Sequence, residues 1–391
     1  MATVVIQLRT EELPARIPVA PGYGRAYVVL RRHDEPIARF DLPVTNGEVD
    51  PAAFAHALFE EARKNGHRWL AREYLGPESP GFIGETTVAV CTRERPTDLR
   101  RTLAALKQLD PRPLESIVID NAPRSSDTRD VVAEFSGVRY VCEPRRGLDC
   151  ARNRALREAR GEIVAFTDDD AAPEPAWLGA LVRAFHDRRV WCTTGLTLPI
   201  ELETDAQEWF ERYSSFSRGF RRRVFEGASH DGLSVGSIGA GANMAVRRSV
   251  LTDLGGFDEA LDAGTPTRSG GDHELFGRIL AAGHNIVYEP AAVSWHRHRR
   301  TWPELRETLH GYGTGVFALM TRRVFRDHEP AALRHGLRRF CRHHLPTLWR
   351  ALWRRPDTTP LDLISAEVAG CVAGPAAYVR SARALRRRLT S

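Results

Sequence analysis

Short apolar runs that alternate with helical segments are the feature that most constrains the fold of this chain. Thr87–Cys91, Ser116–Asp120 and Glu162–Thr167 are β-type runs in which apolar residues follow one another without alternation. Such runs are typical of strands buried on both faces, as in a parallel sheet covered by helices. Thr97–Leu109 and Leu148–Arg160 lie between them and have apolar residues at helical spacing. The alternation predicts an α/β domain built around a largely parallel sheet.

The chain of 391 residues is longer than one ordinary domain. We expect three parts: a small β/α module over residues 1–81, the α/β domain over 82–300, and a helical extension over 301–391. In the first part, a hairpin is expected around Arg31–Glu35, followed by a helix over Ala52–Tyr74.

Composition and charge narrow the class of protein. With 42% hydrophobic and 27% charged residues, the chain has the composition of a soluble globular protein. No secretory signal or membrane-spanning run is apparent, and the six cysteines lack paired spacing, so a cytoplasmic protein with reduced thiols is expected. Residues 299–391 hold 18 arginines against 7 acidic residues, a balance that suits an anionic membrane surface, an acidic partner or nucleic acid.

Carboxylates follow two of the predicted strands. Asp120 ends the second run, and Asp168, Asp169 and Asp170 follow the third. In parallel sheets, ligands bind beyond the carboxyl ends of the strands. Adjacent oxygen ligands at such an edge suit Mg²⁺ or Mn²⁺. The competing interpretation is an acidic surface loop that caps the next helix.

Two later segments also hold candidate residues. Asp272 opens a helix after a Gly-rich stretch, so it is either an N-cap or a general base. His296 and His298 occupy alternate positions of an extended segment and therefore share one face. One of them would join the aspartates as a metal ligand, or both would be ordinary surface histidines.

These segments, in this order, resemble family 2 glycosyltransferases over roughly residues 86–300. The matching motifs are Val88–Arg93, Ile119–Asn121, Gly147–Asn153, Ile163–Asp170, Gly241–Arg248, Gly255–Asp258 and Gly270–Leu275. The resemblance implies a GT-A fold with a Rossmann-like sheet. It also implies an inverting transfer of a sugar from a UDP, GDP or dTDP donor to an acceptor hydroxyl.

The resemblance further implies a role for each matched residue. The donor-binding residues would be Thr92, Arg93, Asp120, Arg152, Asn153, Asp168 and Asp169. Asp170 and His296 would hold Mg²⁺ or Mn²⁺, and Asp272 would be the catalytic base. The sugar or acceptor pocket would contain Trp177, Asn243 and Glu274. The chain departs from the family at Gly271, which stands where the catalytic pair has a Glu that contacts the acceptor.

Two other classes of protein remain as alternatives. A sugar nucleotidyltransferase would carry a Gly-rich loop with Arg and Lys after its first strand, whereas Cys91–Pro96 contains neither Gly nor Lys. A non-catalytic basic protein would bind membrane or nucleic acid, but no nucleic-acid motif is present. For a transferase, the acceptor would be a bacterial envelope glycan or polysaccharide, a lipid-linked molecule or a small natural product.

An amphipathic helix is expected in the C-terminal part. An apolar stripe at helical spacing runs through Leu345, Leu348, Trp349, Leu352 and Trp353, with arginines on both sides. Trp and Arg around an apolar face are typical of a helix that lies on a membrane surface, here the inner face of the cell membrane. The stripe would otherwise pack on the catalytic domain or on the partner of a homodimer.

Overall fold

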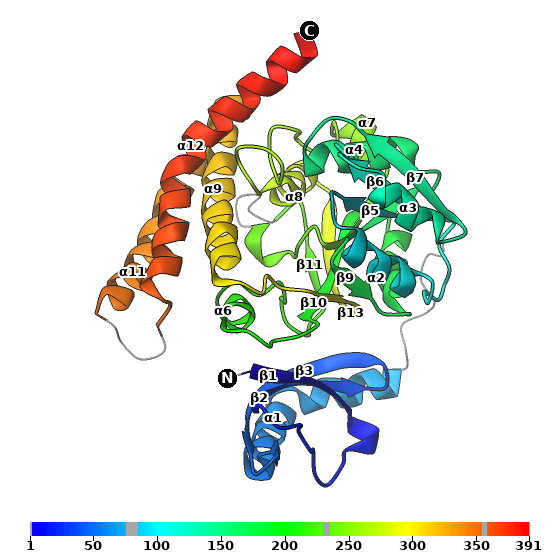
Figure 1. The fold of residues 1–391 in the computed structure, drawn as a ribbon, viewed down its shortest axis with the longest axis vertical. Helices are drawn as coiled ribbons and strands as arrows, with labels where there is room; N and C mark the ends of the chain where they lie inside the picture. Colours follow the sequence, from blue (N-terminus) through cyan, green and yellow to red (C-terminus); the bar gives the residue numbers. More distant parts are fainter. Residues whose placement is uncertain (1, 76–84, 230–234, 354–357, 391) are drawn as a thin grey trace.

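The computed structural model describes residues 2–75, 85–229, 235–353 and 358–390. It contains an N-terminal sheet with one helix, a central α/β sheet with its helices and a group of C-terminal helices (Figure 1). The predicted α/β class is confirmed. The predicted boundary between residues 81 and 82 lies outside the described residues.

The N-terminal module is a four-stranded sheet with a long helix on one face. Its elements are β1 (Ala2–Arg9), a 3₁₀ turn η1 (Thr10–Glu12), β2 (Tyr23–Arg32), β3 (Glu35–Thr45), β4 (Glu48–Val49) and α1 (Pro51–Leu75). The expected hairpin is the β2–β3 pair, and β1 adds a parallel strand beside β2. Alternate residues of β2 point to opposite faces. Val28 and Leu30 face α1, whereas Tyr27 and Val29 join the core of the central domain.

The central sheet has nine strands in the order β11-β13-β10-β12-β8-β5-β6-β7, with β9 paired to β13. The strands are β5 (Thr86–Thr92), β6 (Glu115–Asn121), β7 (Val138–Glu143), β8 (Ile163–Asp168), β9 (Ala171–Pro173), β10 (Val190–Pro199), β11 (Arg223–Phe225), β12 (Asn243–Arg247) and β13 (Asn285–His296). β5 to β8 are mutually parallel, and β12 is antiparallel to both of its neighbours. β10 and β12 are not among the strands predicted from the sequence.

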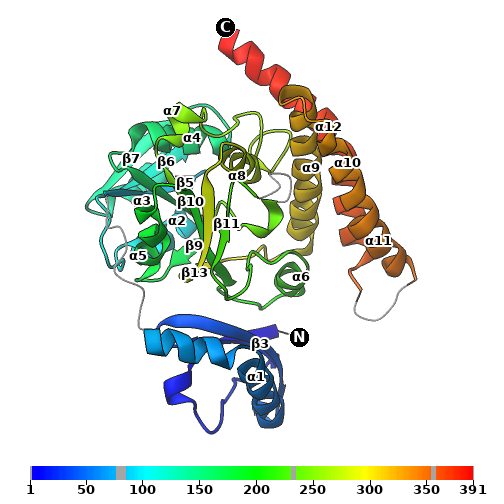
Figure 2. The same ribbon diagram turned by 180° about the vertical axis from the view of Figure 1, so that it is seen from behind.

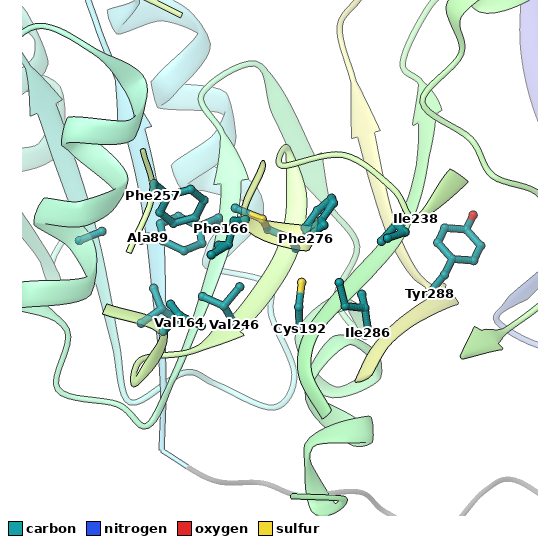
Figure 3. Packing of buried hydrophobic residues seen from close by; sticks show 14 of the residues in the cluster. Ala89, Val164, Phe166, Cys192, Ile238, Val246, Phe257, Phe276, Ile286 and Tyr288 are labelled. Carbon is teal, nitrogen blue, oxygen red and sulfur yellow. The ribbon is translucent and has the colours of Figure 1, made fainter. Parts of the chain in front are cut away.

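Helices cover both faces of this sheet. They are α2 (Pro96–Leu106), α3 (Asp127–Ala133), α4 (Leu148–Glu158), α5 (Trp177–Val182) with η2 (Arg183–His186), α6 (Asp205–Ser214), η3 (Val235–Ser237), α7 (Val250–Asp253) and α8 (Gly271–Ala281). α2, α3 and α5 pack on one face, whereas α4 and α8 pack on the other. Figure 3 shows the core on the face covered by α4 and α8, where Phe257 and Phe276 lie over the strand residues Phe166 and Val246.

The C-terminal extension is helical, as expected. It consists of α9 (Trp302–Arg326), α10 (Ala331–Arg339), a π-helical turn η4 (Phe340–His344), α11 (Leu345–Leu352) and α12 (Leu361–Thr390). α9 and α12 run side by side along the central domain (Figures 1 and 2). Glycines permit this approach: a Cβ on Gly313 would lie 2.2 Å from the carbonyl oxygen of Glu367. Among the described residues, no helix has the length and apolar character needed to cross a bilayer.

Candidate active site

The parallel strands β5, β6 and β8 bring three polar side chains to one edge of the sheet. Thr92 is paired in register with Asp120, and Cys91 with Asp168. Asp120 and Asp168 therefore lie at the same edge of the sheet, on either side of β5, although they are far apart in the sequence. This arrangement follows from the local strand runs, and it places the candidate residues where ligands of α/β sheets bind.

Asp120 has one oxygen available for a ligand. The residue is fully buried, and its Oδ2 accepts a hydrogen bond of 2.9 Å from the Tyr140 hydroxyl. Its Oδ1 is buried without a hydrogen-bond partner among the described residues. Burial raises the pKa of Asp120 despite that bond. An unpaired buried acceptor is costly, so Oδ1 is suited to accept a bond from a donor group such as the N–H of a nucleobase.

Asp168, Asp170 and His296 form a cluster with the geometry of a divalent-metal site. One potential ligand atom of each lies within 4.8 Å of the others. His296 Nε2 is 3.0 Å from Asp170 Oδ1. Burial and the neighbouring Asp170 raise the pKa of Asp168. Burial also opposes ionisation of Asp170, but the positive charges of His296, Arg95 and Arg299 outweigh it and hold the pKa of Asp170 below its usual range. A half-buried carboxylate, a buried carboxylate and a buried imidazole fit Mn²⁺ well and Mg²⁺ adequately.

Two arginines beside this cluster were not among the predicted site residues. Arg95 donates to Asp169 at 3.1 Å and to Asp170 at 2.9 Å, and Arg299 lies 3.4 Å from Asp170. Asp169 also accepts a bond of 2.7 Å from the Thr92 hydroxyl, and burial raises its pKa to about 6. Asp169 and Thr92 therefore hold each other at the strand ends. The signal for Arg95 was its place in the loop directly after the first strand.

Asp272 lies in the first turn of α8 with both carboxylate oxygens fixed. Oδ2 accepts from the backbone N–H of Gly241, and Oδ1 from that of His273, each at 2.7 Å. Burial opposes ionisation, but His273, Arg152 and these N–H groups lower the pKa of Asp272. The N-cap is Gly270, in the left-handed region with φ 106°. Asp272 is thus an oriented, ionised carboxylate and not the capping residue.

Arg152 is buried among carboxylates next to Asp272. It pairs with Asp149 at 3.1 Å and with Asp262 at 2.7 Å. Burial opposes its charge, but Asp262, Asp149, Asp272 and Asp168 raise its pKa overall. Arg152 thus balances the negative charge around the candidate base and the metal cluster. From the sequence, it was predicted to bind the donor.

Gly271 faces Asp149 at very short range. A Cβ on Gly271 would lie 1.9 Å from Asp149 Oδ2, which is buried without a hydrogen bond among the described residues. Burial, then Asp262, raises the pKa of Asp149 well above its usual value. The resemblance places a Glu at this position, but here the residue has no side chain. The carboxylate of Asp149, from α4, fills the adjacent space instead. Asp149 and Asp262 were not predicted as site residues.

The structure does not bring four predicted site residues into an open pocket. Trp177 and Asn243 are fully buried, and the indole Nε1 donates to the amide Oδ1 at 2.8 Å. Asn153 bonds the backbone of Phe257 through both amide atoms. Glu274 is buried against arginines of α8 and α9. All four side chains stabilise the fold around the site.

Arg93 lies in the loop predicted to bind the donor, and its Nε is buried without a hydrogen-bond partner among the described residues.

A cavity of about 930 Å³ adjoins the metal cluster. Its walls come from the 262–269 loop, α9 and α12, and Arg95 and Arg299 reach into it. Three further arginines line it: Arg146, Arg268 and Arg380. The C-terminal extension thus forms one wall of the space beside the candidate site.

Comparisons with known proteins agree with this geometry. The model of the family "Glycosyl transferase family 2" matches residues 87–255. A pre-mycofactocin glycosyltransferase of Mycobacterium tuberculosis is 31% identical over 58% of this chain and 46% of its own length. The probable glycosyltransferase YdaM of Bacillus subtilis is 27% identical over 56% of this chain and 52% of its own. The chain thus spans about half the length of these two relatives. An uncharacterized glycosyltransferase of Mycobacterium bovis, Mb0553, is 32% identical over 52% of this chain and 81% of its own.

Proposed function

The chain belongs to glycosyltransferase family 2 and has the GT-A fold, and we propose that it is a metal-dependent, inverting enzyme that transfers a sugar from a nucleoside diphosphate to an acceptor hydroxyl. The observation that carries this proposal is a pair of sites on one sheet edge. One is the cluster of Asp168, Asp170 and His296, and the other is the ionised carboxylate of Asp272.

The donor would lie along the ends of β5, β6 and β8. Asp120 would accept a hydrogen bond from the base through Oδ1, which lacks a partner among the described residues, and Asp168 would contact the ribose or a metal-bound water. A divalent ion at Asp170 and His296 would neutralise charge on the departing diphosphate. Arg95 and Arg299 add positive charge at the same place. The leaving group is thus stabilised without a covalent intermediate.

Asp272 would take the proton from the acceptor hydroxyl. Its carboxylate is ionised at neutral pH and is held by two backbone N–H groups, so its free lone pairs keep a fixed direction. A single displacement by a hydroxyl activated in this way inverts the anomeric carbon. The adjoining cavity has room for an acceptor, and both arginines and carboxylates line it.

A turnover assay tests this proposal. The purified protein is incubated with UDP-, GDP- and dTDP-sugars and Mn²⁺, and release of free nucleotide is measured with wild type and Asp272→Asn. We expect one nucleotide class to be turned over, and the variant to lose that activity. Release of pyrophosphate from a nucleoside triphosphate and sugar phosphate would instead indicate a sugar nucleotidyltransferase. Donor binding without any turnover would indicate a non-catalytic protein.

We also propose that the enzyme works at the inner surface of the membrane, where a lipid-linked acceptor is presented. The apolar stripe of α11 does not pack on the catalytic domain. It continues a row of exposed residues from α10, which are 46% to 67% exposed: Leu333, Leu337, Leu345, Trp349, Leu352 and Trp353. Residues 331–353 contain five arginines and no acidic residue. An apolar face with only cations around it suits an anionic bilayer.

Vesicle flotation tests the membrane proposal. Wild type should float with anionic vesicles, not with neutral ones, and high salt should weaken the binding. Trp349→Asp should abolish flotation, whereas Val372→Asp, at an exposed apolar position of α12, should leave it unchanged. Wild type that stays in the soluble fraction contradicts the proposal. If it is then dimeric in solution and Trp349→Asp is monomeric, the stripe is a homodimer interface.

A further inference from the structure

Two carboxylates, Glu174 and the buried Glu211, connect the N-terminal module to the segment that carries His296, and we propose that this module positions the metal-binding cluster of the catalytic domain. The proposal rests on the proposed function, because it takes Asp170 and His296 as the metal ligands, with Asp168 beside them. Arg31, Tyr27 and Arg39 of the module would then be positioning residues: they touch neither metal nor donor, and they act through Glu174 and Glu211.

The first connection runs through Glu174. Arg31 donates from both terminal nitrogens to the two carboxylate oxygens of Glu174, each at 2.7 Å. The indole Nε1 of Trp295 donates to the same carboxylate at 2.8 Å. Arg31 is only 6% exposed, so this bidentate pair is largely shielded from water. Trp295 directly precedes His296, so the pair fixes one side of the metal ligand.

Glu174 also lies at the end of the short β9–β13 pairing that brings Asp170 next to His296. β9 starts one residue after Asp170 and runs antiparallel to β13, with Ala171 opposite His296. The backbone N–H of Glu174 closes this ladder by donating to the carbonyl of Val293 at 3.1 Å. A shift of β9 along β13 would therefore change the separation of Asp170 and His296. Arg31 opposes such a shift because it fixes the Glu174 carboxylate, which also accepts a hydrogen bond from Trp295.

The second connection runs through Glu211 of α6. Its Oε1 accepts from the Tyr27 hydroxyl at 3.0 Å and from Arg39 at 2.9 Å. Its Oε2 lies 3.1 Å from Nε2 of His298. The His298 ring packs beside that of His296, with centroids 5.6 Å apart. Both rings are buried, so the position of His298 limits that of His296.

The two connections hold β13 from opposite faces. Trp295 and His296 point to opposite faces of the strand. Glu174 bonds the module and Trp295 of β13, whereas Glu211 bonds the module and His298, two residues beyond the end of β13. Removal of a module partner takes hydrogen bonds from one of these carboxylates, and a carboxylate that loses them reorients or draws in water. Changes in the module would therefore reach the metal ligand through the glutamates.

Manganese binding to the full chain tests the proposal. Titration calorimetry measures the Kd for Mn²⁺ in the presence of whichever of UDP or GDP binds. Partners of a metal ligand change metal affinity by about 10–100-fold. We expect Arg31→Met to weaken Mn²⁺ binding at least about tenfold and Tyr27→Phe to weaken it several-fold. Nucleotide binding in EDTA should stay unchanged. Asn65→Ala is the matched control, since it removes a module contact, to Arg221, that involves neither Glu174 nor Glu211.

The outcomes separate this proposal from the proposed function. If wild type binds Mn²⁺ and folded Arg31→Met binds it equally well, the positioning role is wrong and the metal site stands. If Arg31→Met does not fold, Tyr27→Phe decides in the same way, since it removes one hydroxyl only. An equal loss in Asn65→Ala also overturns the proposal, because it indicates general destabilisation. If wild type binds no Mn²⁺, the metal-dependent function itself fails.

Discussion

Replacement of Gly271 by alanine should destabilise the protein, because the new methyl group meets the buried carboxylate of Asp149. The added Cβ would lie 1.9 Å from Asp149 Oδ2 and 2.6 Å from its Cγ. Asp149 is fully buried and pairs with Arg152, so displacing it strains that ion pair. Asp272 follows Gly271 directly, so a shift of this turn also disturbs the candidate base.

The magnitude follows from two opposing effects. Ala is favoured over Gly in a helix by up to about 1 kcal/mol. Overpacking of a core costs about 1–3 kcal/mol, and a contact this short belongs at the upper end. We therefore expect Gly271→Ala to lower the free energy of unfolding by about 2 kcal/mol. In an Asp149→Ala background the clash is gone, so the same change should be neutral or stabilising by up to about 1 kcal/mol, which gives a coupling energy of about 2–3 kcal/mol.

Urea denaturation of the wild type, both single variants and the double variant measures this coupling. Gly66→Ala is the matched control: Gly66 lies within α1, and a Cβ there meets nothing within 4 Å. The control should be neutral or stabilising by up to about 1 kcal/mol. If Gly271→Ala behaves like Gly66→Ala, or if the coupling is below about 0.5 kcal/mol, then Asp149 does not fill the space that Gly271 leaves.

Three further outcomes are expected. Asp272→Asn should lower kcat by roughly two to four decades with little change in Tm, measured by nucleotide release and thermal melts; near wild-type turnover would move the role of base to another carboxylate. Asp170→Ala should abolish transfer without unfolding the protein, and EDTA should do the same to wild type; full activity in chelator would contradict a metal site. His344 is buried, which lowers its folded-state pKa from 6.5 to about 4, so the unfolded chain gains a proton first as pH falls. Stability should therefore drop by about 1–2 kcal/mol between pH 7 and 5, and His344→Gln should reduce that drop in urea melts.

The sheet edge was predictable because its signals are local. Asp120 and Asp168 each end a short apolar run, and parallel strands necessarily bring such ends together. His296 was placed by resemblance, and its alignment with Asp170 depends on the β9–β13 pairing, which joins segments far apart in the sequence. That pairing has no local signal, because β9 is only three residues long.

Other features depend on contacts that a sequence pattern does not contain. Trp177 and Asn243 carry polar groups that could contact a ligand, and they were predicted to line a pocket. In the structure, the indole N–H of Trp177 instead donates a hydrogen bond to the amide oxygen of Asn243 inside the core. The sequence shows only that Gly271 lacks the expected Glu side chain. The structure shows that Asp149, from another helix, occupies the space beside it. Likewise, Arg31 and Glu174 are 143 residues apart, so nothing in the N-terminal sequence indicated a connection to the site.

Calorimetric titration of nucleotide sugars with and without Mn²⁺ tests the central claim most directly. Wild type should bind one of the UDP-, GDP- or dTDP-sugars with Mn²⁺ and bind it at least about tenfold more weakly in EDTA. Asp170→Ala, folded by circular dichroism, should show the weak binding under both conditions. Equal affinity with and without the metal, or binding by Asp170→Ala that still responds to Mn²⁺ as wild type does, would contradict a metal-dependent donor site at this sheet edge.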